Sequence, residues 1–335
     1  MRHGLVGLRG VGVFLPTFAG AGGRTGGELA AFARRAEDLG FDSVWATDHL
    51  LHQSRFYAVP WLDPIVSLTY VAATTSRLRL GTSVLVLPTR QPVVLAKQVA
   101  TLQALADERY ILGVGTGWDD REFRAVGQRR AERGGRTDES IAILRRLLAG
   151  EPVTYDGRFY QLRDVAVGPA MRSPLRLWTA GGRQLPHAAS PERPVMAPAV
   201  LRRIAASDGW IARPTSLPSQ ISEDLAEIRP ALAAAGRDPG TFTAAHENFL
   251  HLVPTEDRAK ALAEQRRAFT AIMGDGRPFE YFEQVYLTGT PSEIVDKLRA
   301  RLATGIEYLI LHTLEPRVAQ LDLWAEHVLP HLGAG

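Results

Sequence analysis

Eight short apolar segments alternate with helical patterns along this 335-residue chain. Strand-like segments that alternate with helices predict a parallel sheet covered by helices. Eight such units are typical of a (β/α)8 TIM barrel, and a doubly wound open sheet is the competing α/β arrangement. The expected strands lie at 11–16, 43–47, 77–88, 109–114, 175–179, 209–212, 242–252 and 306–311. The expected helices lie at 27–39, 63–75, 92–106, 119–126, 136–148, 219–235, 255–272, 291–303 and 319–332.

The length of the chain fits one such domain over residues 1–335, because a barrel needs roughly 250 residues plus insertions. Residues 151–164 predict a hairpin that turns at Asp156-Gly157. Residues 183–198 hold four prolines, which preclude a continuous helix. We interpret 183–198 as a proline-rich insertion at the C-terminal face that covers the barrel mouth; a partner contact and a disordered loop are the alternatives.

Composition excludes several kinds of function. The chain has no cysteine, which rules out disulfides, thiolate metal sites and a cysteine nucleophile. Its formal net charge is only +3, and no aromatic-interleaved basic patch indicates nucleic-acid binding. No apolar run reaches the ~18 residues of a membrane helix, and the N-terminus lacks a signal-peptide pattern. We therefore expect a cytoplasmic enzyme with no nucleic-acid or membrane partner.

The segment 77–88 reads as a buried strand that is interrupted in its middle. Gly81-Thr82-Ser83 divides two apolar runs, and small residues inside a strand mark a bulge or a close approach of backbone or ligand. Such interruptions gather at functional sites, although an ordinary barrel strand with a glycine kink gives the same pattern.

The ends of the expected strands carry the candidate chemistry, because barrel active sites lie at that face. Asp48-His49 places a carboxylate beside an imidazole that can exchange protons near neutral pH. A helix cap next to a structural histidine is the alternative. The glycines of 113–117 and Gly181-Gly182, with Arg183 beside them, offer free backbone N–H groups for a phosphate, although glycine turns at strand ends are common.

Several established motifs are absent. The glycines near 113 do not have the dinucleotide spacing, and there is no Walker loop, no H-E-x-x-H and no G-x-S-x-G. No metal site is indicated, since His246 and Glu247 are adjacent on an expected strand and so face opposite ways. Trp45 and Trp178 are expected to pack in the core.

At these residues the chain resembles the luciferase-like monooxygenase superfamily, and within it the oxidoreductases that depend on coenzyme F420, a deazaflavin. The resemblance covers nearly all of the chain except 183–198. The matching segments are 39–45 with Asp48-His49, 80–85, 92–105, 112–118, 157–160, 180–182, 206–210 and 324–332.

The resemblance implies a bacterial-luciferase-type barrel with insertions at its C-terminal face, and it assigns roles to particular residues. Asp48 and His49 lie beside the redox ring, His49 being the favoured acid–base group. Ser83-Val84 is the family's non-prolyl cis peptide behind the ring. The residues that approach the cofactor's side chain and phosphate are Gly115, Thr116, Gly117, Ala180, Gly181, Gly182 and Arg183. The residues expected to line the substrate pocket are Phe14, Trp118, Trp210 and His312.

Trp118 replaces a glutamate that is catalytic in the family's sugar-phosphate dehydrogenases, which argues against sugar-phosphate oxidation.

Reduced F420 donates hydride and reacts poorly with oxygen. The expected function is therefore an F420-dependent reductase acting on an activated C=C or C=N bond of a small molecule or modified peptide. An FMN-dependent monooxygenase and a non-catalytic flavin-binding protein are the alternatives. The resemblance also implies a homodimer.

Overall fold

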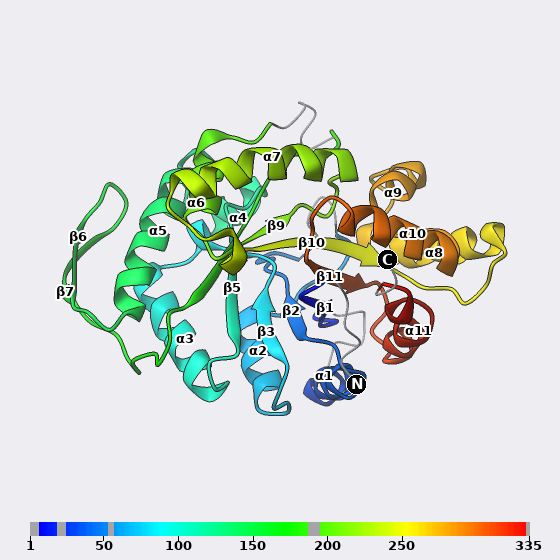
Figure 1. The fold of residues 1–335 in the computed structure, drawn as a ribbon. Coiled ribbons are helices and arrows are strands. Elements are labelled where there is room, and N and C mark those ends of the chain that lie inside the picture. The colour runs from blue at the N-terminus through cyan, green and yellow to red at the C-terminus, as the bar shows by residue number, and fades with distance from the viewer. Residues whose placement is uncertain (1–6, 19–24, 53–56, 187–194, 333–335) are drawn as a thin grey trace.

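A closed barrel of parallel strands forms the centre of the computed structural model, which describes residues 7–18, 25–52, 57–186 and 195–332 (Figure 1). The strands pair in the order β3-β2-β1-β11-β10-β9-β8-β5-β4, and pairing of β3 with β5 closes the circle. The barrel strands are β1 (Gly10–Phe14), β2 (Ser43–Ala46), β3 (Arg79–Thr82), β4 (Leu85–Val86), β5 (Tyr110–Gly115), β8 (Arg176–Ala180), β9 (Gly209–Ala212), β10 (Thr243–Leu250) and β11 (Tyr308–Thr313). Because β3 and β4 are two pieces of one interrupted strand, the barrel has the eight positions that the sequence predicted.

Helices surround the barrel, as the alternation in the sequence predicted. The helices are α1 (Gly26–Asp38), α2 (Pro64–Ala72), α3 (Pro92–Leu105), α4 (Asp120–Ala125), α5 (Arg133–Leu148), α6 (Pro198–Ala205), α7 (Pro218–Ala234), α8 (Arg258–Met273), α9 (Phe279–Val285), α10 (Pro291–Leu302) and α11 (Ala319–His327). Several begin with a side-chain cap followed by proline, as α2 does at Asp63 and Pro64. In the described part of the chain, no helix combines the length and apolar character that a membrane crossing requires.

Two helices were not predicted from the sequence. The eight-residue α6 begins at Pro198, where proline occupies the first turn and so starts a helix rather than breaking one. The seven-residue α9 is too short to show a helical period. Residues 187–194 lie outside the described part, and with them half of the insertion 183–198 that we expected over the mouth.

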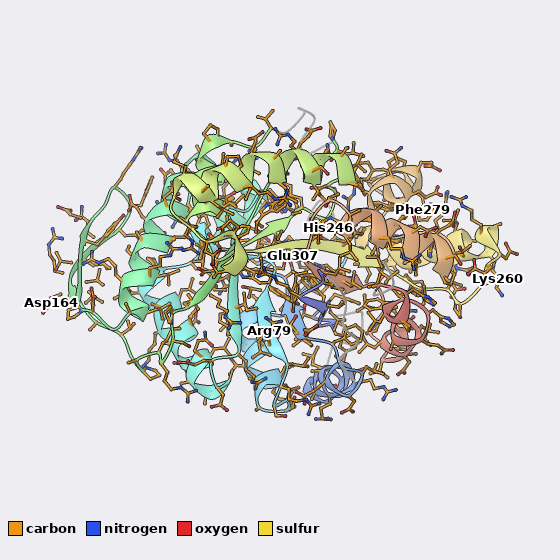
Figure 2. All side chains as sticks on the ribbon, in the orientation of Figure 1. Arg79, Asp164, His246, Lys260, Phe279 and Glu307 are labelled. Carbon is orange, nitrogen blue, oxygen red and sulfur yellow. The ribbon has the colours of Figure 1, made fainter. Side chains whose placement is uncertain are left out.

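The predicted hairpin is confirmed, with a later turn. β6 (Val153–Asp156) pairs antiparallel with β7 (Gln161–Val165), and the N–H of Gly157 donates to the carbonyl of Tyr160. The loop is therefore 157–160 rather than a two-residue Asp-Gly turn. This hairpin stands at the outer edge of the molecule, where Figure 2 labels Asp164, far from Phe279 on α9 at the other side.

Aromatic and other apolar side chains gather in two regions, one inside the barrel and one outside it. Trp45 and Trp178 lie inside the barrel with Tyr308, which confirms that both tryptophans belong to the core. A second group, the aromatic cluster, joins the end of β10 to helices α8 and α9 and to Phe18 and Leu314, which follow β1 and β11. The buried aromatic members of this cluster are Phe18, Phe249, Phe269, Phe279, Phe282 and Tyr286.

Candidate active site at the barrel mouth

The break between β3 and β4 contains the cis bond that the sequence predicted, between Ser83 and Val84. The backbone of β5 comes close at this point. A side chain at Gly113 would collide with the Thr82 carbonyl, and a Cβ at Gly115 would lie 2.6 Å from Val84 Cγ2. Glycine is therefore required at positions 113 and 115, because the backbone of β5 lies so close to the break between β3 and β4.

Glu247 joins the break to the far side of the mouth. Its carboxylate accepts a hydrogen bond from Ser83 Oγ, and its Oε1 lies 3.0 Å from Nε2 of His312. β10 lies four steps from β3 around a barrel of eight strand positions, so the contact between Glu247 and Ser83 crosses the barrel. Because an ionised carboxylate only accepts, His312 Nε2 carries the hydrogen when Glu247 is charged.

His312 is fixed in an apolar setting. Its ring stacks between Phe14 and Phe249, with a centroid distance of 4.1 Å to Phe249. Burial lowers the pKa of His312, and the adjacent Glu247 carboxylate only partly opposes this effect. The structure thus places two of the expected pocket residues, Phe14 and His312, together at the mouth.

Glu247 was missed as a site residue by sequence reasoning. Ala245 and Glu247 share one face of β10, and Ala245 packs inside the barrel. An acidic residue in register with inward apolar residues was the signal available in the sequence. Its neighbour His246 faces outward, fully buried, with Nε2 3.1 Å from the Arg213 carbonyl oxygen.

Asp48 does not form an acid–base pair with His49, which corrects that prediction. Its carboxylate accepts hydrogen bonds from the Val86 N–H at 2.9 Å and from Arg90 Nη2 at 2.8 Å. Asp48 is 6% exposed. It is therefore a structural anchor between the end of β2 and the chain after β4, and Arg90, which sequence reasoning missed, is its partner.

His49 is close to a different carboxylate. Its Nδ1 lies 3.4 Å from Glu122 Oε1, but this nitrogen is buried and has no hydrogen-bond partner in the described residues. Glu122 instead accepts from the Leu50 N–H at 2.9 Å. A proton carried on Nδ1 would therefore face the Glu122 carboxylate.

Aromatic rings surround His49. Tyr57, Trp61 and Trp118 have ring centroids 4.9, 6.0 and 6.0 Å from it. Trp118 is 37% exposed and so presents part of its surface beside His49.

Trp210, in contrast, does not line the mouth. It is fully buried between the barrel and the helices, and its Nε1 donates to the Gly181 carbonyl at 2.9 Å. Its expected place in the substrate pocket is wrong, since it faces outward from β9.

The loop after β8 has neither the free backbone N–H groups nor the free cation that we expected, because the Gly181 N–H donates to the Ile211 carbonyl at 3.2 Å and the Arg183 N–H to Asp224 at 2.8 Å. Gly182 has a φ of +117°, and a Cβ there would collide with Asp224. The Arg183 guanidinium contacts Asp224, Glu223 and Glu227. Three carboxylates compensate its charge, so Arg183 does not offer a free cation to a phosphate.

The chain is similar to known proteins over most of its length. The family model of the luciferase-like monooxygenases matches residues 10–280. An F420-dependent glucose-6-phosphate dehydrogenase from Kineococcus radiotolerans is 32% identical over 317 residues, which cover 85% of this chain and 87% of the relative. An F420-dependent hydroxymycolic acid dehydrogenase from Mycobacterium tuberculosis is 29% identical, with 91% of this chain and 84% of the relative covered.

Solved structures share the fold. An F420-dependent secondary alcohol dehydrogenase in complex with an F420-acetone adduct has a TM-score of 0.78 at 19% identity, covering 97% of this chain and 99% of the other. A monooxygenase from Streptomyces bottropensis has a TM-score of 0.77 at 24% identity, covering 96% and 99%. Because the family model spans most of the sequence, the chain belongs to the luciferase-like monooxygenase family, as its motifs predicted.

Proposed function

We propose that this protein is an F420-dependent oxidoreductase that acts as a reductase on an activated C=C or C=N bond. Relatives with F420-dependent dehydrogenase activity in their names support this cofactor over most of the chain. When bound, reduced F420 supplies a hydride. The residues of the chain must then hold the ring, exclude water and supply a proton.

The residues at the mouth fit a planar ring with polar edges. Val84 and Ala180 pack against the apolar interior cluster and form a surface suited to a flat ring. Glu247 and His49 lie at the same end of the barrel. The observation that carries the proposal is this combination: an apolar platform at the β3–β4 break, with buried groups beside it that can hold a proton.

His49 is the acid–base group that we assign to the reaction. We expect the His49 imidazole, whose Nδ1 lies 3.4 Å from the Glu122 carboxylate, to give a proton to the substrate carbon or heteroatom that does not receive the hydride. Ser83, Glu247 and His312 hold a second proton across the mouth and orient one another.

The substrate that we propose is a small, largely apolar unsaturated molecule or a modified peptide. Trp118 is 37% exposed and gives the entrance an apolar surface. Trp118 also stands where sugar-phosphate dehydrogenases of the family carry glutamate. We therefore expect no oxidation of glucose 6-phosphate. The expected homodimer and cytoplasmic location remain part of this proposal.

Parallel calorimetric titrations with F420 and FMN test the cofactor, and anaerobic oxidation of reduced F420 by unsaturated substrates tests the reaction. We expect tight binding of F420, weak binding of FMN and no substrate-dependent oxygen consumption. In His49→Ala, kcat should fall by roughly 10²-fold or more while F420 affinity is kept. Tight FMN binding with oxygen consumption would instead identify a monooxygenase, and binding without any turnover a non-catalytic protein.

A further inference from the structure

Glu122 is a buried carboxylate that lies beside His49. It stands in the first turn of α4 and is 3% exposed. The one ion pair found for it among the described residues joins its Oε1 to His49 Nδ1, at 3.4 Å. Arg121, the adjacent residue, pairs with Asp119 instead, at 2.8 Å. Because a buried carboxylate needs a compensating charge, His49 is the group that can supply one.

The same carboxylate holds the backbone that carries His49. Its Oε1 accepts from the Leu50 N–H at 2.9 Å and from the Leu51 N–H at 3.5 Å. These contacts join the chain after β2 to α4. One oxygen of Glu122 therefore fixes the residue that follows His49 and also faces the His49 ring.

The charge of Glu122 favours one of the two neutral forms of the His49 ring. Nδ1 is buried, and without a hydrogen it would turn its lone pair toward a negatively charged oxygen. With a hydrogen it presents the positive end of the N–H bond instead. The separation of 3.4 Å is longer than an aligned hydrogen bond, so the attraction is mainly one of charge. The neutral ring therefore keeps its hydrogen on Nδ1, which leaves Nε2 for a ligand.

The surroundings of His49 strengthen this effect. Three aromatic rings have centroids 4.9 to 6.0 Å from the His49 ring, and such apolar neighbours lower the local dielectric. Asp119, also on α4, and His312, on β11, are the other titratable groups that interact with the charge of His49. Since Asp119 is paired with Arg121, the charge of Glu122 is the one left for His49.

We infer that Glu122 is a positioning residue for His49: its carboxylate keeps a hydrogen on Nδ1, so that Nε2 exchanges the proton with the substrate. The state of the ring does not depend on the proposed function, whereas the proton transfer rests on it. In that transfer the Nε2–H bond breaks, and the proton goes to the substrate atom that does not receive the hydride. The ring that remains is the neutral form that Glu122 stabilises, and Nε2 then takes a proton from water.

The test compares the wild type with Glu122→Gln, whose amide oxygen can still accept from the Leu50 N–H although the negative charge is lost. Glu139→Gln is the matched control. Glu139, on α5, also accepts from backbone N–H groups, those of Arg158 and Phe159 at 2.9 and 3.0 Å, in the hairpin at the outer edge of the molecule (Figure 2).

Two measurements are made on each protein. Nitrogen-15 NMR of the ligand-free protein at alkaline pH shows which ring nitrogen of His49 carries the hydrogen, and the signals missing in His49→Ala assign the ring. Anaerobic oxidation of reduced F420 by unsaturated substrates gives kcat.

We expect the neutral His49 ring to carry its hydrogen on Nδ1 in the wild type and in Glu139→Gln. In Glu122→Gln the hydrogen should move in part to Nε2, and kcat should fall by roughly 10- to 100-fold. Glu122→Asp keeps the charge at a greater distance and should retain part of both properties, which separates the effect of charge from loss of folding.

A wild-type His49 with its hydrogen on Nε2 overturns the inference, as does a Glu122→Gln protein with the wild-type tautomer and kcat. A fall in kcat without a change of tautomer also overturns it, because the substitution then reaches the reaction by another route. If the wild type does not oxidise reduced F420 with any unsaturated substrate, the proposed function fails, and the ring-nitrogen shifts alone decide whether Glu122 sets the state of His49.

Discussion

Glu247 shows how one residue acquires a role through two partners from distant strands. Ser83 and His312 both contact its carboxylate, one on each oxygen. The pair fixes the carboxylate across the mouth and keeps a proton within the network. We regard Glu247 as a positioning residue for the groups that face the ligand.

Replacement of Glu247 by glutamine tests this role. We expect kcat to fall by roughly 10²-fold while F420 affinity changes by only a few fold, because the proton-holding network is lost and the apolar platform is kept. The pKa of His312 should fall further, since the carboxylate that opposes its lowering is removed. NMR titration of the His312 ring measures this shift.

Glu283→Gln is the matched control, because Glu283 lies on α9 and pairs with Arg258 at 3.1 Å on the surface side. It should keep the wild-type rate and leave the His312 titration unmoved. A Glu247→Gln protein with full kcat and an unchanged His312 ring would contradict the assigned role.

At the level of elements, the ion pair of Asp48 and Arg90 joins the end of β2 to the chain that follows β4. Although burial opposes it, the two carboxylates of Asp48 and Asp63 hold the pKa of Arg90 above its ordinary value. The pair therefore stabilises the turn at 87–89, which leads from the interrupted strand into α3.

Asp48→Asn should lower the free energy of unfolding by about 3–5 kcal/mol, because it leaves a largely buried guanidinium without its main partner. Asp63→Asn removes the other carboxylate, 3.0 Å from Arg90 but 41% exposed, and should cost at most ~1 kcal/mol. Urea unfolding of the two variants measures the difference. An equal decrease in the free energy of unfolding in both variants would show that the buried Asp48–Arg90 pair stabilises the protein no more than the exposed Asp63–Arg90 pair.

The length and periodicity of an element decided whether it could be predicted from the sequence. Long segments with a clear period, such as α3 and β5, were found close to their true bounds because local patterning determines them. The short α6 and α9 were missed. Their helical conformation is stabilised by packing, as Phe279 and Phe282 show by lying in the aromatic cluster, rather than by a pattern of their own.

For the whole molecule, buried histidines connect stability to pH. Burial lowers the pKa of His246, His251 and His312 below the ordinary value near 6.5. Below that value the unfolded chain binds protons at these rings that the folded protein does not bind. Stability is therefore fully present above about pH 6.5 and is lost as the pH falls below it.

We expect the free energy of unfolding to decrease between pH 6.5 and 5.5 by up to about 1.4 kcal/mol for each histidine that stays neutral. Urea unfolding at several pH values measures the slope, which gives the number of protons taken up. A free energy that stays constant over this range would show that the buried rings titrate normally.

By itself, the sequence determined the barrel through its local periodicity, and its motifs carried the family resemblance that implied the cis bond at Ser83-Val84. The tertiary structure alone decided which charges meet. Glu247 contacts Ser83 and His312 across separations of 164 and 65 residues. The charge of Arg183 is compensated by carboxylates of α7. The reason is physical: partners across a barrel mouth depend on strand register and closure, which bring together side chains that no local pattern relates.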